Sequence, residues 1–392
     1  MVKKAITVAI GGAFASVALV LAATATSAAK TAAAAPSGVS CSNPIQIGME
    51  GPFTGPAASI GDDQLHWAEF FATQWNKSHA VKINIVQGDT QLNPAIASTV
   101  SQSFASNSSI VGVIGPAGSQ EVTAAAPILK KAGLAFVSGS ATNPALTNGS
   151  LKGYFFRVVP NDSVQGPTDA NFMMKKLGVT KGSTVMIVDD QESYSTGLAS
   201  IVKSDLTKAG VNVDSESISQ KDTDFSALVA KVGSSTKVVF TPFQLASQTQ
   251  LLAQQLKSQG KKAVVFATDG SFDTSKYNAP GNYVSFFAAD VTTIPSDKSI
   301  VVAYHKQFPG GTSPFGAPNY VAAQLYAQAA TKACAAGKGT ITRASLRSAL
   351  ASQKIVKSIL GTPMAFTPNG DVAGAAFHIF KIVGNKTYVT LS

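Results

Sequence analysis

Short, mostly apolar runs alternate with longer stretches that are apolar on one side along most of this chain. Ile45–Glu50 and Ile110–Ile114 are runs of the first kind, as expected of strands that helices cover on both faces. Between them, Leu65, Ala68 and Phe71 recur every third position, which predicts an amphipathic helix. The pattern therefore predicts strand–helix units that build a parallel sheet.

The same plan occurs a second time after residue 180. Strands are predicted at 183–188, 211–218, 237–241 and 263–267, with helices at about 195–208, 224–232 and 244–259. Two blocks of alternating strands and helices favour an α/β fold of two doubly wound, Rossmann-like lobes.

The last hundred residues follow a different order. Three helices are predicted in series at about 297–308, 317–337 and 342–353, and a hairpin at 376–383 and 386–391, joined through Gly384-Asn385. We expect the helices to return to the first lobe and the hairpin to the second. Lobe 1 then comprises 44–159 plus 290–360, and lobe 2 comprises 160–289 plus 361–392. A chain that crosses repeatedly between lobes makes a natural hinge.

Residues 1–35 are typical of an export signal and a small-residue leader. Lys3 and Lys4 precede an uncharged apolar run from Ala5 to about Ala23, and small residues follow to Ala35. A membrane span is the alternative, but the many Ala, Gly and Ser residues favour a cleaved signal. Export permits a disulfide between Cys41 and Cys334, which we favour over two free buried thiols.

The net charge of +10 does not indicate nucleic-acid binding. Lysines are spread along the chain, and Arg157, Arg343 and Arg347 are its three arginines, so no basic block with interleaved aromatics exists. The four histidines show no metal-ligand spacing, and no nucleophile elbow, dinucleotide loop or phosphate loop is present. Asp189-Asp190 lacks a third metal ligand at workable spacing. We therefore expect neither an enzyme nor a bound cofactor or metal.

Candidate binding groups follow several strands. Ligands of open α/β sheets bind at the carboxyl ends of strands, where this chain has Gly115–Ser119, Ser138–Pro144, Asp189–Tyr194 and Thr268–Gly270. The first two loops offer hydroxyls and main-chain N–H groups that can hold an anion. In the other two, Asp269 can meet an ammonium and Tyr194 can cover it. Helix capping and turn formation are the alternative roles of these residues.

Several segments of the chain together resemble one known family. They are Ile47-Gly48 with Gly51–Pro56, Ser140–Thr147, Arg157–Asp162, Tyr194–Gly197, Asp224–Ser226, and Gly361–Phe366 with Gly370-Asp371. In this order and spacing they resemble the type I periplasmic binding proteins of the leucine/isoleucine/valine-binding family, which deliver solutes to ABC importers. The resemblance implies two α/β lobes joined by a three-crossover hinge.

The resemblance also implies a site for an amino acid. Ser119, Ser140 and Thr142 match first-lobe positions that hold the ligand's carboxylate and ammonium with hydroxyl and main-chain groups. Tyr194 and Asp269 would complete the site from the second lobe, with Asp269 pairing with the ammonium.

The chain departs from the family on the side-chain part of this pocket. Ile60 stands where the family commonly has a tyrosine, and Trp67 stands where a small residue is usual. Phe243 and Gln244 stand where an aromatic contact is usual.

The implied protein is an exported, monomeric, non-enzymatic binding component of an ABC importer. It would act in the periplasm or extracellular cell envelope with a membrane permease as partner. We expect a small aliphatic or aromatic amino acid as ligand. A related ligand (an amide, a urea-like compound or an aromatic acid) and a ligand-sensing receptor domain stay as alternatives.

Overall fold

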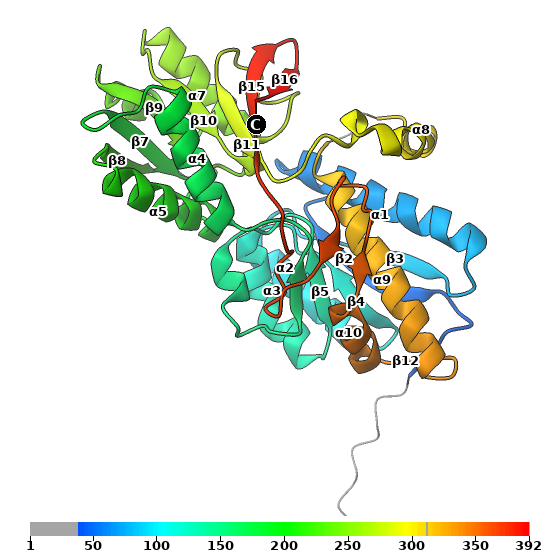
Figure 1. Cartoon of the computed structure of the whole chain (residues 1–392). Coiled ribbons are helices and arrows are strands. Elements are labelled where there is room, and N and C mark those ends of the chain that lie inside the picture. Colours follow the sequence, from blue (N-terminus) through cyan, green and yellow to red (C-terminus); the bar gives the residue numbers. More distant parts are fainter. Residues whose placement is uncertain (1–37, 311–312, 392) are drawn as a thin grey trace, which may run out of the picture. The chain divides into compact units, whose positions relative to one another are not determined.

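The computed structural model describes residues 38–310 and 313–391 (Figure 1). The predicted signal segment 1–35 lies outside this range. Within it, no helix combines the length and the apolar character needed to cross a membrane.

The first lobe is built on a five-stranded parallel sheet with the order β3-β2-β4-β5-β6. Its strands are β2 (Ile45–Gly51), β3 (Ile83–Asp89), β4 (Ile110–Ile114), β5 (Ala135–Ser138) and β6 (Phe155–Arg157). The helices between them are α1 (Ala58–Ser78), α2 (Pro94–Ser106) and α3 (Ser119–Lys131). Asn93 caps α2 by accepting from the main-chain N–H groups of Ala95 and Ile96, and Pro94 is the first helical residue.

The second lobe contains a seven-stranded sheet with the order β16-β15-β11-β10-β9-β7-β8. Its parallel strands are β7 (Thr184–Asp189), β8 (Asn212–Ser217), β9 (Thr236–Thr241), β10 (Val264–Ala267) and β11 (Tyr283–Phe286). The helices are α4 (Asp162–Lys176), α5 (Ser193–Lys208), α6 (Ser226–Ala230) and α7 (Ala246–Ser258). The hairpin β15 (His378–Gly384) and β16 (Thr387–Thr390) adds to β11 in antiparallel fashion.

Helices cover both faces of each sheet. In the first lobe, α1 lies beside α9 (Gly316–Ala336) (Figure 1). These two and α10 (Arg343–Ala351) pack on one face, while α2 and α3 pack on the other. In the second lobe, α4 and α5 cover one face, and α6 and α7 the opposite one. The predicted α/β class with two doubly wound lobes is confirmed.

The strand order shows which strand ends lie where a ligand would bind. In both lobes the first strand lies between the second and the third, so the order reverses beside β2 and β4 in one lobe and beside β7 and β9 in the other. Ligands of open α/β sheets bind at such reversals. The segments that begin there carry Ser119 after β4, Tyr194 after β7 and Gln244 after β9.

The last part of the chain returns to both lobes. After α8 (Lys298–Gln307), α9 and α10 pack on the first sheet, and the hairpin joins the second. Lys354–Ile355 (β13) pairs with Met364–Ala365 (β14), and Met364 lies in the first lobe's core. The final crossover is therefore the stretch that follows Ala365, several residues beyond position 361.

Cys41 and Cys334 form a disulfide, the pairing that the sequence favours. It lies beside a small antiparallel pair, β1 (Val39–Ser40) with β12 (Thr340–Ile341). The bond thus joins the segment before β2 to the end of α9, and both belong to the first lobe.

Candidate ligand-binding site

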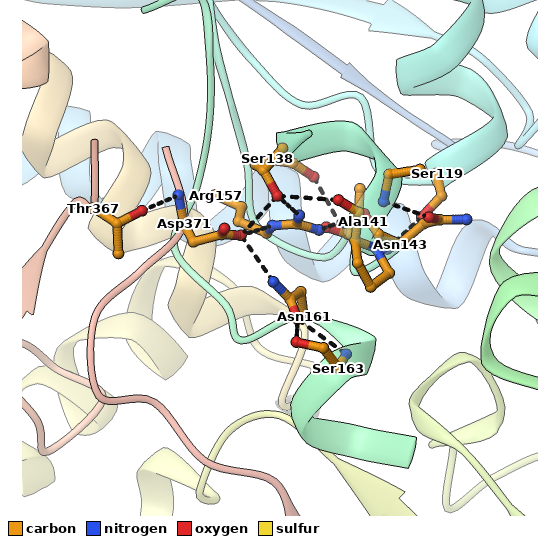
Figure 2. Close-up of polar contacts among 12 residues, drawn as sticks. Ser119, Ser138, Ala141, Asn143, Arg157, Asn161, Ser163, Thr367 and Asp371 are labelled. Carbon is orange, nitrogen blue, oxygen red and sulfur yellow. Dashed lines mark hydrogen bonds and ion pairs between the residues drawn. The ribbon is translucent and has the colours of Figure 1, made fainter. Parts of the chain in front are cut away.

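The first lobe contributes the start of α3 and the loop after β5. Ser119 is the first residue of α3, where main-chain N–H groups lack partners within the helix. Its Oγ accepts a hydrogen bond of 3.2 Å from the main-chain N of Asn143 (Figure 2). The Ser119 hydroxyl therefore keeps its own proton for an acceptor such as a ligand carboxylate.

Ser140 and Thr142 lie in the loop that follows β5. The Ser140 hydroxyl donates to the carbonyl of Ala117 at 2.8 Å and accepts from Nε2 of Gln64 at 2.9 Å. Because these two contacts occupy the hydroxyl, Ser140 would contact a ligand through its main chain. Thr142 is fully buried, and its hydroxyl has no hydrogen-bond partner among the described residues.

The second lobe contributes a buried carboxylate with neutral donors. Asp269 begins a short 3-10 helix, Asp269–Ser271, directly after β10. Its Oδ1 lies 2.7 Å from the Tyr194 hydroxyl and 2.7 Å from Nε2 of Gln165, which donates to it. The Tyr194 hydroxyl is also 2.7 Å from Oγ1 of Thr268. It has one proton, so it donates to an ionised Asp269 and accepts from Thr268.

Burial sets the protonation of the acids in this region. It raises the pKa of Asp269 to about 6, against the lowering effect of the hydrogen bonds from Tyr194 and Gln165. Burial and the charge of Asp269 raise the pKa of Asp162 to about 8, and burial raises that of Asp169 well above its usual range. Of these three acids, Asp269 is therefore the one that is ionised at neutral pH.

Groups from both lobes line one small cavity. Ser119 and Ser140 face it from the first lobe, and Tyr194 and Asp269 from the second. The cavity measures about 30 Å³, enough for the centres of about two water molecules. Thr142 is not among its lining residues.

A second cavity of about 420 Å³ shares Ile60, Gln244 and Gly270 with the first, so the two are neighbours. Its volume is in the range of small-molecule sites. The arrangement is a small polar pocket for charged groups beside a larger space for the rest of a ligand.

The profile of the family described as "Periplasmic binding protein" matches residues 44–387. The chain belongs to this family. The predicted resemblance to the type I proteins of the leucine/isoleucine/valine-binding group is confirmed by its relatives. An "Amino acid binding protein" from Pseudomonas aeruginosa is 28% identical over 73% of this chain and 77% of its own length. The Leu/Ile/Val-binding protein of Escherichia coli is 28% identical over 88% of this chain and 92% of its own length.

Solved structures show the same fold. A leucine-binding protein from Thermotoga maritima matches with a TM-score of 0.79 at 20% identity, covering 89% of this chain and 98% of its own. A branched-chain amino acid substrate-binding protein from Streptococcus pneumoniae, in complex with isoleucine, gives 0.76 at 23%, covering 89% and 100%. A solute-binding protein from R. palustris, in complex with benzoate, gives 0.76 at 17%, covering 89% and 96%.

The four residues predicted to line the side-chain pocket of this periplasmic binding protein fall into two groups. Ile60 and Gln244 line both cavities. Trp67 and Phe243 are fully buried and line neither. Trp67 stacks on Tyr304 with ring centroids 4.1 Å apart in the first lobe's core.

Phe243 is turned into the core of the second lobe. Its carbonyl faces Gly270, where an added Cβ would come within 2.5 Å of that oxygen. Glycine at position 270 thus lets the loop after β9 pass directly beside the loop that carries Asp269.

Direct hydrogen bonds join the lobes of this periplasmic binding protein beside the two cavities, and one of them runs from Nζ of Lys276 to the Ser59 hydroxyl at 3.1 Å. The side-chain amides of Gln120 and Gln244 exchange two hydrogen bonds, 2.9 and 3.1 Å long. Nδ2 of Asn143 donates to the carbonyl of Ser193 at 2.6 Å. These contacts need the lobes to be close, so they stabilise the closed arrangement of the two lobes.

Sequence reasoning did not identify several residues at this site. Leu92 and Phe315 line the small cavity, and Gln165 reaches Asp269 from α4. The position of Gln120 beside Ser119 was the one available signal, since both start the same helix. Among residues 38–310 and 313–391, no three His, Cys, Asp or Glu side chains gather as metal ligands.

Proposed function

We propose that this protein is the exported substrate-binding component of an ABC importer and that it captures an amino acid with an aliphatic or aromatic side chain. The relatives named above bind amino acids according to their names. The proposed protein is a monomer that acts outside the cytoplasmic membrane and delivers its ligand to a membrane permease.

The observation that carries the proposal is the opposition of two kinds of group across the small cavity. Ser119 and the first turn of α3 offer hydrogen-bond donors on one side, which suit a carboxylate. Asp269 and Tyr194 offer a negative charge and a hydroxyl on the other side, which suit an ammonium. An α-amino acid carries both groups on adjacent atoms, and a zwitterion that loses its water needs partners for both charges.

Closure follows from where these groups come from. The carboxylate donors belong to the first lobe and the ammonium acceptors to the second. A ligand that touches both lobes binds the closed state more tightly than the open state and shifts the population toward it. A permease can then distinguish loaded from empty protein by its shape.

The larger cavity gives the ligand's side chain its place. Ile60 and Gln244 mark the passage between the two cavities, so a side chain that leaves the polar pocket passes these residues. Ile60 is apolar, so it favours an aliphatic or aromatic group at this passage, while Asp62, His66 and Lys276 line the larger cavity farther on.

Thermal unfolding with a panel of compounds tests the proposal. The panel contains the twenty L-amino acids, with acetamide, urea and benzoate as the related ligands. One amino acid should raise Tm, because a ligand at one hundred times its Kd stabilises the folded state by about 2.7 kcal/mol. A shift with benzoate or an amide and none with any amino acid would replace the amino-acid assignment by the related one.

Uptake is tested separately. Deletion of the gene should abolish import of the amino acid that binds, and re-expression should restore it. Normal import in the deletion strain, together with a lost transcriptional or behavioural response to that amino acid, would favour the receptor alternative.

A further inference from the structure

The first crossover is the segment between β6 and α4, and the last crossover is the stretch after Ala365. The two meet at the carboxylate of Asp371 (Figure 2). Oδ1 of Asp371 accepts from Nε of Arg157 at 2.7 Å and from Nδ2 of Asn161 at 3.1 Å. It also lies 3.2 Å from the hydroxyl of Thr147, at the end of the loop that Arg157 contacts. The main chains also touch, since the N of Arg157 donates to the carbonyl of Gly370 at 2.9 Å. Gly370 has a φ of +96°, and an added Cβ would lie 2.2 Å from the carbonyl of Phe155. Glycine is required for this close approach.

One branch of contacts leads from Asp371 to the binding loop of the first lobe. The guanidinium of Arg157 is fully buried, and its Nη1 donates to the carbonyls of Ala141 and Asn143, each at 3.0 Å. These two carbonyls flank Thr142. Asn143 in turn donates its main-chain N–H to Ser119. Arg157 thus fixes the main chain that holds the Ser119 hydroxyl in place.

Arg157 depends on Asp371 for its charge balance. Burial lowers the pKa of the guanidinium, and the charge of Asp371 opposes that effect. A buried guanidinium without its counter-charge would be held less firmly against the carbonyls of the loop.

A second branch leads from Asp371 to the carboxylate of the second lobe. Asn161 is the N-cap of α4, and its Oδ1 accepts from the main-chain N of Ser163 at 3.0 Å. One turn later, Gln165 donates to Asp269 at 2.7 Å. The Asn161 side chain therefore has two roles. Its amide nitrogen binds Asp371, and its amide oxygen caps α4, the helix from which Gln165 reaches Asp269.

We propose that Asp371 is a positioning residue for ligand capture, which holds the first and last crossovers together and keeps the binding groups of both lobes in register while the hinge bends. It touches no ligand group itself. It acts through Arg157 on the loop around Thr142 and through Asn161 on the helix that reaches Asp269.

Hydrogen–deuterium exchange on the full chain without added ligand tests the positioning. Asp371→Ala should accelerate amide exchange at least tenfold in residues 140–147 and in residues 162–166, but not in the central strands β4 and β9. Asp371→Asn, which keeps an oxygen for Arg157, should give the same pattern with smaller amplitude and serves if the alanine variant does not fold. Acceleration in all strands alike, or in one of the two segments alone, would overturn the proposal.

Two further variants separate the branches. Asn161→Ala should accelerate exchange in residues 162–166 and leave residues 140–147 unchanged. Glu216→Ala breaks an exposed ion pair with Lys231 of the same 2.7 Å length, remote from the hinge, and should leave both segments unchanged. Equal acceleration in both segments by Asn161→Ala would contradict two separate branches.

The role in capture needs a closure measurement, and this part rests on the proposed function. Dyes on Lys131→Cys and Lys208→Cys, one exposed position in each lobe, report the distance between lobes by energy transfer. The probe is an equimolar mixture of the twenty L-amino acids. Asp371→Ala should need at least tenfold more of it for half-maximal closure, and an unchanged midpoint would overturn the role in capture. If the wild-type protein does not respond, the proposed function fails, and the exchange experiment still decides on positioning.

Discussion

Replacing Asp269 by Asn removes the negative charge of the site and keeps the oxygen that Tyr194 and Gln165 contact. In the proposed complex, the ligand's ammonium has this carboxylate as its counter-charge in a site where Asp269 is 3% exposed. Leaving a buried charge without its partner costs about 3–5 kcal/mol. The Kd for a zwitterionic ligand should therefore rise roughly 150- to 5,000-fold in Asp269→Asn.

The pH dependence gives the same prediction a second, independent form. The ammonium binds the ionised form of Asp269, whose pKa in the ligand-free protein is about 6. Below this pH the carboxyl holds a proton that the ligand must displace, so affinity should fall about tenfold per pH unit. Above it the carboxyl is already ionised, and affinity no longer depends on this group. In Asp269→Asn the step near pH 6 should disappear.

Calorimetric titration between pH 4.5 and 8 measures both effects, with Tyr194→Phe as the matched control. That variant keeps the charge and loses the hydroxyl's hydrogen bonds to Thr268 and Asp269, of which the bond to the charged acceptor is worth about 1.5–3 kcal/mol. The folded state should tolerate Asp269→Asn at pH 7.5, because a carboxyl whose pKa burial has raised destabilises the fold once it is ionised. A Kd within threefold of wild type, or a persistent step near pH 6 in the Asn variant, would refute the assignment of Asp269 to the ammonium.

Three further predictions follow from buried groups. Burial raises the pKa of Glu50 to about 8, and because such a carboxyl ionises at lower pH when unfolded, Tm of the ligand-free protein should fall as pH rises from 5 to 8; calorimetry that shows the opposite slope would contradict this. The Cys41–Cys334 bond spans a sequence separation of 293, so replacing both by Ser should lower the free energy of unfolding by about 6 kcal/mol in the chain-entropy model, as measured by urea unfolding. Phe243→Leu should lower stability and leave ligand preference unchanged, whereas Ile60→Ala should change the preference among amino acids; a changed preference in the first variant would place Phe243 at the ligand.

The fold was predictable because most strands are short apolar runs and the helices have apolar residues at helical spacing. Two strands of the main sheets, one at an edge and one inside, were not predicted in this way. Phe155–Arg157 and Tyr283–Phe286 have three and four residues, too few for a periodic pattern. Each is stabilised by pairing with a neighbour that lies elsewhere in the chain, β5 and β10 respectively. Tertiary contacts, which no local pattern contains, decide such elements.

The grouping of the candidate site residues around one cavity was predictable where position along a strand decides where a residue lies. Ser119, Ser140, Tyr194 and Asp269 all follow strand ends, and topology brings strand ends to one edge. Trp67 and Phe243 are different, because their direction depends on how a helix or loop is rotated against its sheet. Both side chains point into a core, and the sequence alone does not specify that rotation.

The charge distribution around the hinge supports the proposal that the ligand brings a cation to the site. Arg157 is the fully buried guanidinium of this region, and its ion pair is with Asp371. Among the described residues, Asp269 has neutral donors, Tyr194 and Gln165, and no salt bridge. The chain thus neutralises the charge at its hinge and leaves the carboxylate at its ligand cavity without a counter-ion. A ligand ammonium is the group that fits this imbalance, and because the lobes must close to bury it, the same imbalance couples recognition of the ligand to closure.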